Sequence, residues 1–220
     1  MITPPLVEPS ASPWQRRPVG DVVADLLSGI EPPSGRPLIL AVDGRQGGGK
    51  TTVALRLARQ VPGTAVVHTD DVAWWESFFG WDHLMASGIL EPLWRGEDVD
   101  YRPPAWDARG RGGSIVVPAS AALVVVEGVG AARRSLAPLL DGAVWVQSDF
   151  DEAHRRGIAR DSGTRDATDF WWEWDREEQP FLADDRPWER ADAVLCGTPE
   201  LSGVSYDTAL EIIVGRSLRP

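Results

Sequence analysis

The chain has 220 residues, of which 43% are hydrophobic and 25% charged, and this is enough for one compact domain with a sizeable core. Its net charge of -11 argues against binding to nucleic acid or to an anionic membrane surface, because both need a basic protein surface. The single cysteine, Cys196, excludes an internal disulfide and a cysteine-cluster metal site, and it fits a reducing, cytoplasmic environment. No hydrophobic run approaches the ~20 residues of a membrane span.

The first third of the chain alternates between helical and strand patterns. Residues 1–18 are rich in proline and are predicted to be an N-terminal tail, followed by a single domain over residues 19–220. Hydrophobic spacing predicts an amphipathic helix over residues 19–30, and a continuous apolar run predicts a buried strand over 38–42. A second helix and strand are expected at 51–60 and 64–69.

The rest of the chain continues this alternation. The expected elements are a Trp-rich helix (74–89), a loop (91–113), a strand (123–126), a helix (131–140), a strand (143–147), two helices (151–161 and 168–182), a strand (193–196) and an edge strand (209–214). Strands that alternate with helices predict an α/β fold with a central, mostly parallel sheet of five strands. The helices near residues 151–182 would form a small helical lid.

A glycine-rich segment follows the first predicted buried strand. Residues 44–51 read Gly-Arg-Gln-Gly-Gly-Gly-Lys-Thr, which matches the phosphate-binding P-loop pattern G-x-x-x-x-G-K-[ST]. Lys50 is the only lysine in the chain, and a compact ammonium fits between β- and γ-phosphates where a guanidinium would not. The bland alternative is a flexible glycine turn before a helix. The residues expected to bind nucleotide phosphates are Gly44, Gly47, Gly48, Gly49, Lys50, Thr51 and Thr52.

Two oxygen-bearing side chains are candidate ligands for Mg²⁺. The Thr51 hydroxyl follows the P-loop lysine, and Glu127 ends the strand predicted over 123–126. Glu127 could instead be an ordinary surface acid. Asp43, directly before the loop, is expected to be a structural residue or a water-mediated partner of the metal.

Asp70 and Asp71 end the second predicted strand. Carboxylates at the C-terminal edge of a parallel sheet point into the ligand crevice, so one of them could accept the proton of an attacking hydroxyl. Asp70 is favoured as the catalytic base and Asp71 as a substrate contact. The alternative is that these residues cap the following helix.

Four arginines lie in or after the helix predicted over 151–161. Arg156 and Arg160 share one helix face and are expected to close over the transferring phosphoryl group as catalytic lid residues, with Arg155 and Arg165 nearby. The alternative is a solvated helix face on which the arginines pair with acids.

Several aromatic and basic residues could line an acceptor pocket. Trp74, Tyr101, Arg102 and Trp106 are candidate substrate contacts, as is Arg109, although core packing is the alternative for the tryptophans. His68, His83 and His154 lack metal-ligand spacing and are expected to have structural roles.

Taken together, the chain resembles the uridine kinase-like branch of the P-loop kinases, which is related to phosphoribulokinase and bacterial pantothenate kinase. The matching segments are residues 42–52, 68–71, 126–128, 155–161 and 191–194. The resemblance implies the three-layer P-loop NTPase fold. In that family the Asp of an Asp-x-Phe-Tyr motif is the base, and the match falls on Asp70, although Val72 and Ala73 replace the Phe-Tyr pair. The resemblance therefore implies ATP as the phosphate donor and Mg²⁺ as the metal, but it does not imply that uridine is the acceptor.

These features predict a kinase that uses ATP and Mg²⁺ to move the γ-phosphoryl group to a hydroxyl of a small molecule, with nucleosides among the candidates. The alternative is a nucleotide-binding module or an ATPase without an acceptor. The expected partners are ATP and the acceptor, with no nucleic acid and no membrane. The sequence leaves open whether the chain forms a homodimer.

Overall fold

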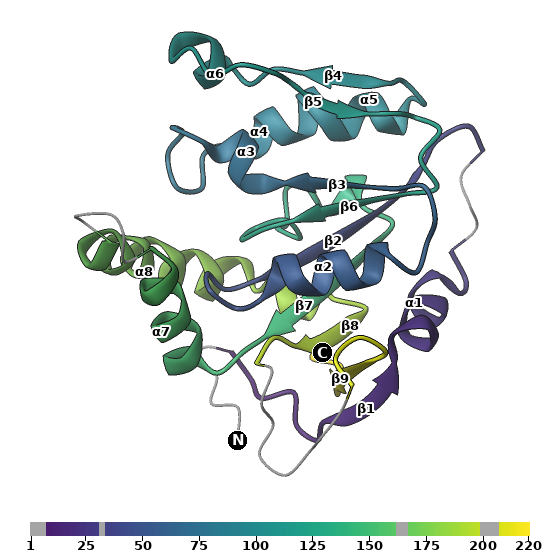
Figure 1. Ribbon diagram of the computed structural model, residues 1–220, viewed down its shortest axis with the longest axis vertical. Coiled ribbons are helices and arrows are strands. Elements are labelled where there is room, and N and C mark those ends of the chain that lie inside the picture. The colour runs from purple at the N-terminus through teal and green to yellow at the C-terminus, as the bar shows by residue number, and fades with distance from the viewer. Residues whose placement is uncertain (1–7, 31–33, 162–166, 199–206) are drawn as a thin grey trace.

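The computed structural model describes residues 8–30, 34–161, 167–198 and 207–220, without the side chains of residues 161 and 167–169 (Figure 1). The strands are β1 (Gln15–Pro18), β2 (Leu38–Gly44), β3 (Thr64–His68), β4 (Val99–Tyr101), β5 (Ile115–Val117), β6 (Leu123–Glu127), β7 (Gly142–Gln147), β8 (Ala193–Cys196) and β9 (Glu211–Gly215). The α-helices are α1 (Val19–Leu27), α2 (Lys50–Ala58), α3 (Thr69–Ala73), α4 (Asp82–Met85), α5 (Glu91–Trp94), α6 (Pro104–Ala108), α7 (Phe150–Asp161) and α8 (Ala167–Asp185). A π-helical turn, η1 (Ala86–Leu90), joins α4 to α5, and η2 (Ala137–Leu139) and η3 (Pro187–Glu189) are 3₁₀ turns.

A seven-stranded sheet forms the middle layer, in the order β1-β9-β8-β7-β2-β6-β3. The five strands from β8 to β3 are parallel, while β9 and β1 are added antiparallel at one edge. The predicted α/β class and the mostly parallel sheet are confirmed, but the sheet has seven strands instead of five. One of the two additional strands, β9, corresponds to the edge strand expected over 209–214, but it pairs with both β8 and β1 and so does not form the edge. The other, β1, was not predicted and lies in the segment expected to be a tail. Its residues, Gln-Arg-Arg-Pro, have no hydrophobic alternation that would mark a strand.

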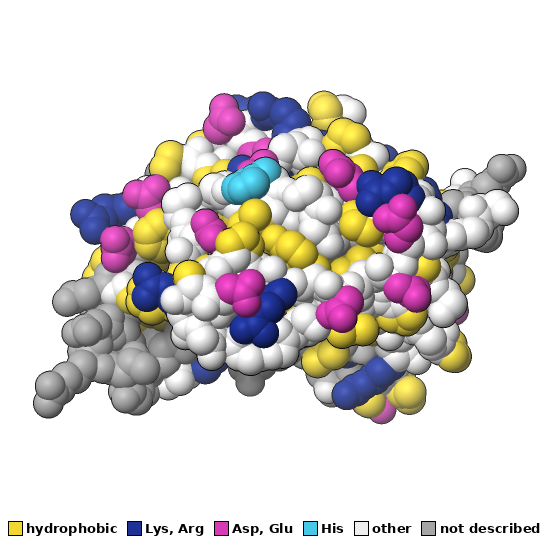
Figure 2. Space-filling model, turned by 90° about the horizontal axis from the view of Figure 1, so that it is seen from above, with side chains coloured by type: hydrophobic (Ala, Val, Ile, Leu, Met, Phe, Trp, Pro, Cys, Tyr) yellow, Lys and Arg dark blue, Asp and Glu magenta, His cyan; other side chains and the backbone are white. Residues whose placement is uncertain are grey.

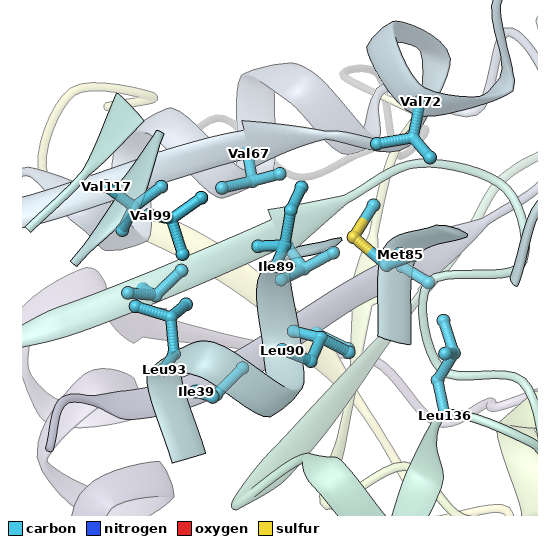
Figure 3. Close-up of a cluster of buried hydrophobic side chains, with 14 of the residues drawn as sticks. Ile39, Val67, Val72, Met85, Ile89, Leu90, Leu93, Val99, Val117 and Leu136 are labelled. Atoms are coloured by element: carbon cyan, nitrogen blue, oxygen red, sulfur yellow. The ribbon is translucent and has the colours of Figure 1, made fainter. Parts of the chain in front are cut away.

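Helices cover both faces of the sheet, so the domain has three layers (Figure 1). On one face, α1 and α2 pack their apolar stripes, including Val22, Leu26 and Leu57, against side chains of the central strands. On the other face, α4, η1 and α5 contribute Met85 and Ile89, among others, to a second core with the sheet (Figure 3). Near α8 and η3, a third cluster packs around Trp145 and Trp188.

Two segments differ from the expected helices. The Trp-rich helix expected over 74–89 is interrupted, because Trp75 has a φ of 66° and an irregular turn separates α3 from α4. The helix expected over 131–140 is replaced by turns that end in η2. Pro138, which has no N–H to donate to a helical hydrogen bond, stands inside the expected helix and in the first turn of η2. The N–H groups of Gly130 and Ala132 donate to the carboxylate of Asp43 at 2.8 and 2.9 Å. The predicted loop over 91–113 contains α5, β4 and α6.

The surface around α6, β4 and β5 carries basic, acidic and hydrophobic side chains side by side, without a broad area of one charge (Figure 2).

Within the described ranges, no helix combines the length and the apolar character needed to cross a membrane.

Candidate active site

The P-loop joins β2 to α2 at the centre of the parallel sheet. β2 lies between β6 and β7, so the chain leaves it where strand order reverses, which is the usual position of the ligand crevice in open α/β sheets. Gly47 and Gly49 adopt positive φ values of 69° and 89°, which favour glycine. A side chain on Gly48 would lie 2.8 Å from the Arg45 carbonyl oxygen, so only glycine fits this close approach. The loop leads directly into the N-terminus of α2, a position that favours anions, and the Gly48 N–H donates to the Arg45 carbonyl oxygen at 3.0 Å.

Three polar side chains meet beside the loop. The Lys50 ammonium donates to the Arg45 carbonyl oxygen at 2.8 Å, so it lies across the loop and not out in solvent. The Thr51 hydroxyl donates to Glu127 Oε1 at 3.1 Å, and the same oxygen lies 2.5 Å from His68 Nδ1. Strand register explains the arrangement, since Glu127 on β6 pairs with Val42 of β2 on one side and with His68 of β3 on the other. The buried carboxylate raises the pKa of His68 mainly through this hydrogen bond.

Asp43, the last residue before the P-loop, holds two backbone segments together beneath the site. Its carboxylate is fully buried and accepts backbone N–H groups from Gly44, Gly130 and Ala132 at 2.7 to 2.9 Å. Burial raises the pKa of Asp43 to about 6 in spite of these bonds. The residue therefore has the structural role, tying the turn after β6 to the P-loop.

The P-loop is also held from the lid side. Glu178 on α8 accepts the backbone N–H of Gln46 at 2.8 Å and an Nη1–H of Arg45 at 3.4 Å. The Arg45 side chain is buried and donates through Nε to Glu8 at 3.1 Å. Glu8 in turn accepts from the indole of Trp145 at 2.5 Å. The lid helix α8 and the N-terminal segment therefore both bind the side chain of Arg45 in the P-loop.

The lid arginines are placed differently from one another. Arg156 donates to the Gly197 carbonyl oxygen at 3.3 Å, and Gly197 packs directly against the backbone of Gly48 and Gly49, so Arg156 lies beside the P-loop. Arg155 points to solvent and pairs with Glu152. Arg160 follows one turn after Arg156 on α7, and Arg165 lies outside the described residues.

The two acids after β3 have different surroundings. Both lie in the first turn of α3. Asp71 forms an ion pair with Arg111, and its carbonyl oxygen accepts the indole N–H of Trp106 at 2.8 Å. Asp70 is exposed, and none of the described residues forms a hydrogen bond or ion pair with its carboxylate. Its charge nonetheless contributes, as does that of Asp71, to the raised pKa of His68.

The candidate acceptor contacts have three kinds of surroundings. Trp74 and Trp106 flank the guanidinium of Arg111, whose carbon lies 5.3 and 3.7 Å from their ring centroids. Tyr101 packs its ring over Gly88, which points to a packing role. Arg102 donates to the carbonyl oxygens of Gly113 (3.1 Å) and Arg111, and so holds the segment after α6 in place.

Sequence reasoning missed several residues of this site. His68 was expected to be structural, although the adjacent ends of β3 and β6 could have pointed to its contact with Glu127. Arg111, Arg45 and Glu178 gave no sequence signal, because their partners lie far along the chain. Ser148 was also missed. Its buried hydroxyl lies beside Gly48 and has no hydrogen-bond partner among the described residues.

The residues present fit a magnesium nucleotide. Thr51 and Glu127 offer the hard oxygen ligands that Mg²⁺ prefers, and Lys50, Ser148 and the loop amides offer donors for phosphate oxygens. The described residues contain no group of three or more His, Cys, Asp or Glu side chains arranged to hold a metal. A metal at Thr51 and Glu127 would therefore take its other ligands from phosphate and water.

No protein-family model matches the chain, and no curated protein matches it either. Two solved structures are similar over most of its length. One is named "Structure of a Possible Uridine Kinase from Bacillus stearothermophilus", with a TM-score of 0.52 and 19% identity over 80% of this chain and 96% of that one. The other is a "putative fructose transport system kinase from Silicibacter sp. TM1040", with a TM-score of 0.54 and 19% identity over 79% and 94%. The chain therefore has a fold like that of P-loop kinases.

Proposed function

We propose that the chain is an ATP- and Mg²⁺-dependent phosphotransferase that acts on a hydroxyl of a small molecule. The observation that carries the proposal is the contact between Thr51 and Glu127, 3.1 Å apart, beside a P-loop whose lysine lies across it. The names printed for the two similar structures, a "Possible Uridine Kinase" and a "putative fructose transport system kinase", agree with this function. A nucleoside or a sugar is compatible with it.

The residues divide the work as follows. The P-loop amides and Lys50 bind and orient the β- and γ-phosphates, and Thr51 and Glu127 hold Mg²⁺, which when bound neutralises phosphate charge. Asp70 accepts the proton of the acceptor hydroxyl while the oxygen of that hydroxyl forms a bond to the γ-phosphorus. The bond from that phosphorus to the β,γ-bridging oxygen breaks, and ADP leaves with the electron pair. Arg156 and Arg160 stabilise the negative charge on the transferring group.

The exposed position of Asp70 supports its role as base. A carboxylate that is not engaged by another side chain is available to a substrate hydroxyl, whereas Asp71 is already paired with Arg111. The two acids therefore suit the division of roles expected from the sequence, in which Asp70 acts on the hydroxyl and Asp71 helps to shape the acceptor side.

A phosphate-transfer screen tests the proposal. Purified protein with MgATP is offered nucleosides, sugars, sugar phosphates and pantothenate, and ADP release and product mass are recorded. We expect one acceptor to gain a phosphoryl group. Lys50→Ala should abolish transfer, and Asp70→Asn should lower kcat by about 10²- to 10⁴-fold with ATP affinity within twofold of the original.

Asp21→Asn, an exposed acid on α1, is the control and should leave transfer unchanged. Rapid hydrolysis of ATP that no acceptor accelerates would instead identify an ATPase. Tight MgATP binding without any turnover would identify a nucleotide-binding module. Transfer retained by Lys50→Ala would refute the phosphate-binding role of the loop.

A further inference from the structure

Two arginines of the segment after α6 lie on tryptophan rings near α3, the helix that carries the proposed base. Arg109 and Arg111 follow α6 directly, and Trp74 and Trp75 follow α3, which carries Asp70 and Asp71. The two segments are joined by the 2.8 Å hydrogen bond from the Trp106 indole to the Asp71 carbonyl oxygen. The arginines are thus fixed to the same helix as the residue that would act on the acceptor hydroxyl.

Arg111 is held in place but keeps free donor capacity. Its guanidinium lies between Trp106 and Trp74, and one nitrogen donates to Asp71. A guanidinium has five N–H donors, so a single carboxylate partner leaves most of them unused. The side chain is 32% exposed, so these donors can be reached from solvent. The bonds from Arg102 to the carbonyl oxygens of Arg111 and Gly113 hold the backbone here.

Arg109 shows the same arrangement without a carboxylate. Its guanidinium carbon lies 3.6 Å above the centroid of the Trp75 ring. Within the described ranges no acid pairs with it. Trp75 is 62% exposed and has a φ of 66°, which a bulky residue rarely adopts. Backbone strain of this kind persists where the surroundings enforce it and gathers at ligand sites.

These observations call for a negatively charged ligand group. An arginine oriented by an aromatic ring, with its donors free, is suited to the planar or tetrahedral oxygens of a carboxylate or a phosphate. In a chain of net charge -11, an anion also needs such local positive charge to approach the site.

We infer that the acceptor carries an anionic group, a carboxylate or a phosphate monoester, which Arg109 and Arg111 bind beside Asp70. The inference rests on the proposed function, because it places this anion on the molecule that is phosphorylated. It narrows the class of possible acceptors from small alcohols in general to small alcohols that carry an acidic group. Arg109 and Arg111 act as specificity-determining residues, and Trp74, Trp75 and Trp106 position them.

Direct binding of anions tests the site. Inorganic phosphate and acetate are titrated separately, and the Nε–Hε NMR signal of Arg109, assigned by its loss in Arg109→Gln, is followed. One sample contains saturating Mg²⁺ and a non-hydrolysable ATP analogue, so that the P-loop is occupied. A second sample is Lys50→Ala without nucleotide, so that the result does not depend on nucleotide binding.

We expect a saturable shift with phosphate, with acetate or with both. Phosphate alone would indicate a phosphate monoester, acetate alone a carboxylate, and both an acceptor site open to either. Trp75→Gly should weaken binding at least fivefold without loss of stability, because glycine accepts the positive φ while the orienting ring is lost. Arg95→Gln, which removes an exposed arginine paired with Glu97, is the charge-matched control and should change nothing. A signal that responds to both anions only as it does to sodium chloride would overturn the inference.

Paired acceptors give the kinetic test. Ribose is compared with ribose 5-phosphate, and pantothenol with pantothenate. The anionic member of a pair that is phosphorylated should have a kcat/KM at least tenfold higher, and Arg109→Gln should remove this advantage by raising KM with kcat within twofold. Equal turnover of neutral and anionic members would overturn the inference and leave the proposed function standing. Absence of any ATP-dependent transfer would count against the proposed function, and the binding titrations would still decide on the anion site.

Discussion

At the scale of single residues, the site depends on buried carboxylates that hold backbone in place. Asp43 accepts three backbone N–H groups from two separate segments, which no local pattern in the sequence would suggest. Its position directly before the loop indicated a role near the nucleotide, but the partners became visible only in the folded chain.

Asp43 should make the stability of the protein depend on pH in an uncommon direction. Burial raises its pKa from the ordinary value to about 6, so the folded state holds this proton more tightly than the unfolded chain does. The contribution of the group to stability is therefore fully present below its unfolded pKa, falls as pH rises toward about 6, and is constant above that. Urea unfolding at pH 4.5 and pH 7.5 measures the change.

Asp43→Asn should remove this part of the pH dependence, because an amide does not titrate. Asp98→Asn, an exposed acid that accepts a single backbone N–H from Ala119, is the matched control and should leave the profile close to that of the original chain. An unchanged pH profile in Asp43→Asn would show that other groups produce the dependence.

At the scale of elements, the lid helix α8 is attached to the P-loop by one carboxylate. Glu178 accepts the N–H of Gln46 and contacts Arg45, although these residues lie 132 and 133 positions earlier in the chain. The same helix also packs against the segment between α3 and α4, since Phe181 of α8 stacks on Phe79 with centroids 4.0 Å apart. The helix α8 therefore holds the P-loop in place, in addition to lying in the lid with the arginines of α7.

Glu178→Ala should weaken ATP binding. The change removes a hydrogen bond to a carboxylate, worth about 1.5–3 kcal/mol, and leaves the Gln46 N–H without its partner. If the loop must be ordered again on binding, we expect a loss of roughly 10- to 100-fold in affinity for a fluorescent ATP analogue. Glu177→Ala, an exposed neighbour on the same helix, is the control. Equal affinities of the two variants for the ATP analogue would show that the contact between Glu178 and the P-loop does not contribute to nucleotide binding.

At the scale of the whole molecule, the N-terminal segment is part of the domain. β1 pairs with β9, and Glu8 reaches the carboxyl ends of the central strands, where it binds Arg45, Trp145 and Gln147. Burial raises the pKa of Glu8, while the charge of Arg45 opposes this shift. The segment predicted to be a tail thus closes one edge of the sheet and supports the P-loop.

Removal of the Glu8 carboxylate should destabilise the fold strongly. Glu8→Ala leaves the buried Arg45 with one acid partner instead of two, and loss of one partner of a buried ion pair costs about 3–5 kcal/mol. Glu97→Ala breaks an exposed ion pair with Arg95 and should cost about 0–1 kcal/mol. Urea unfolding at pH 8 compares the two. A similar small loss in both variants would show that Glu178 alone neutralises Arg45.

The sequence by itself determined the α/β class, the parallel strands, the P-loop, and the positions of Thr51, Glu127 and Asp70 at strand or helix ends. This was possible because hydrophobic runs and a contiguous motif are local, and because parallel strands end at a common edge. Only the tertiary structure decided which groups meet near that edge: His68 with Glu127, Glu178 with the backbone N–H of Gln46, Glu8 with Arg45, and Arg111 with Asp71. The physical reason is that charged and polar groups that are wholly or partly buried pair with the partners that the packed layers bring within reach, and these partners lie tens of residues away along the chain.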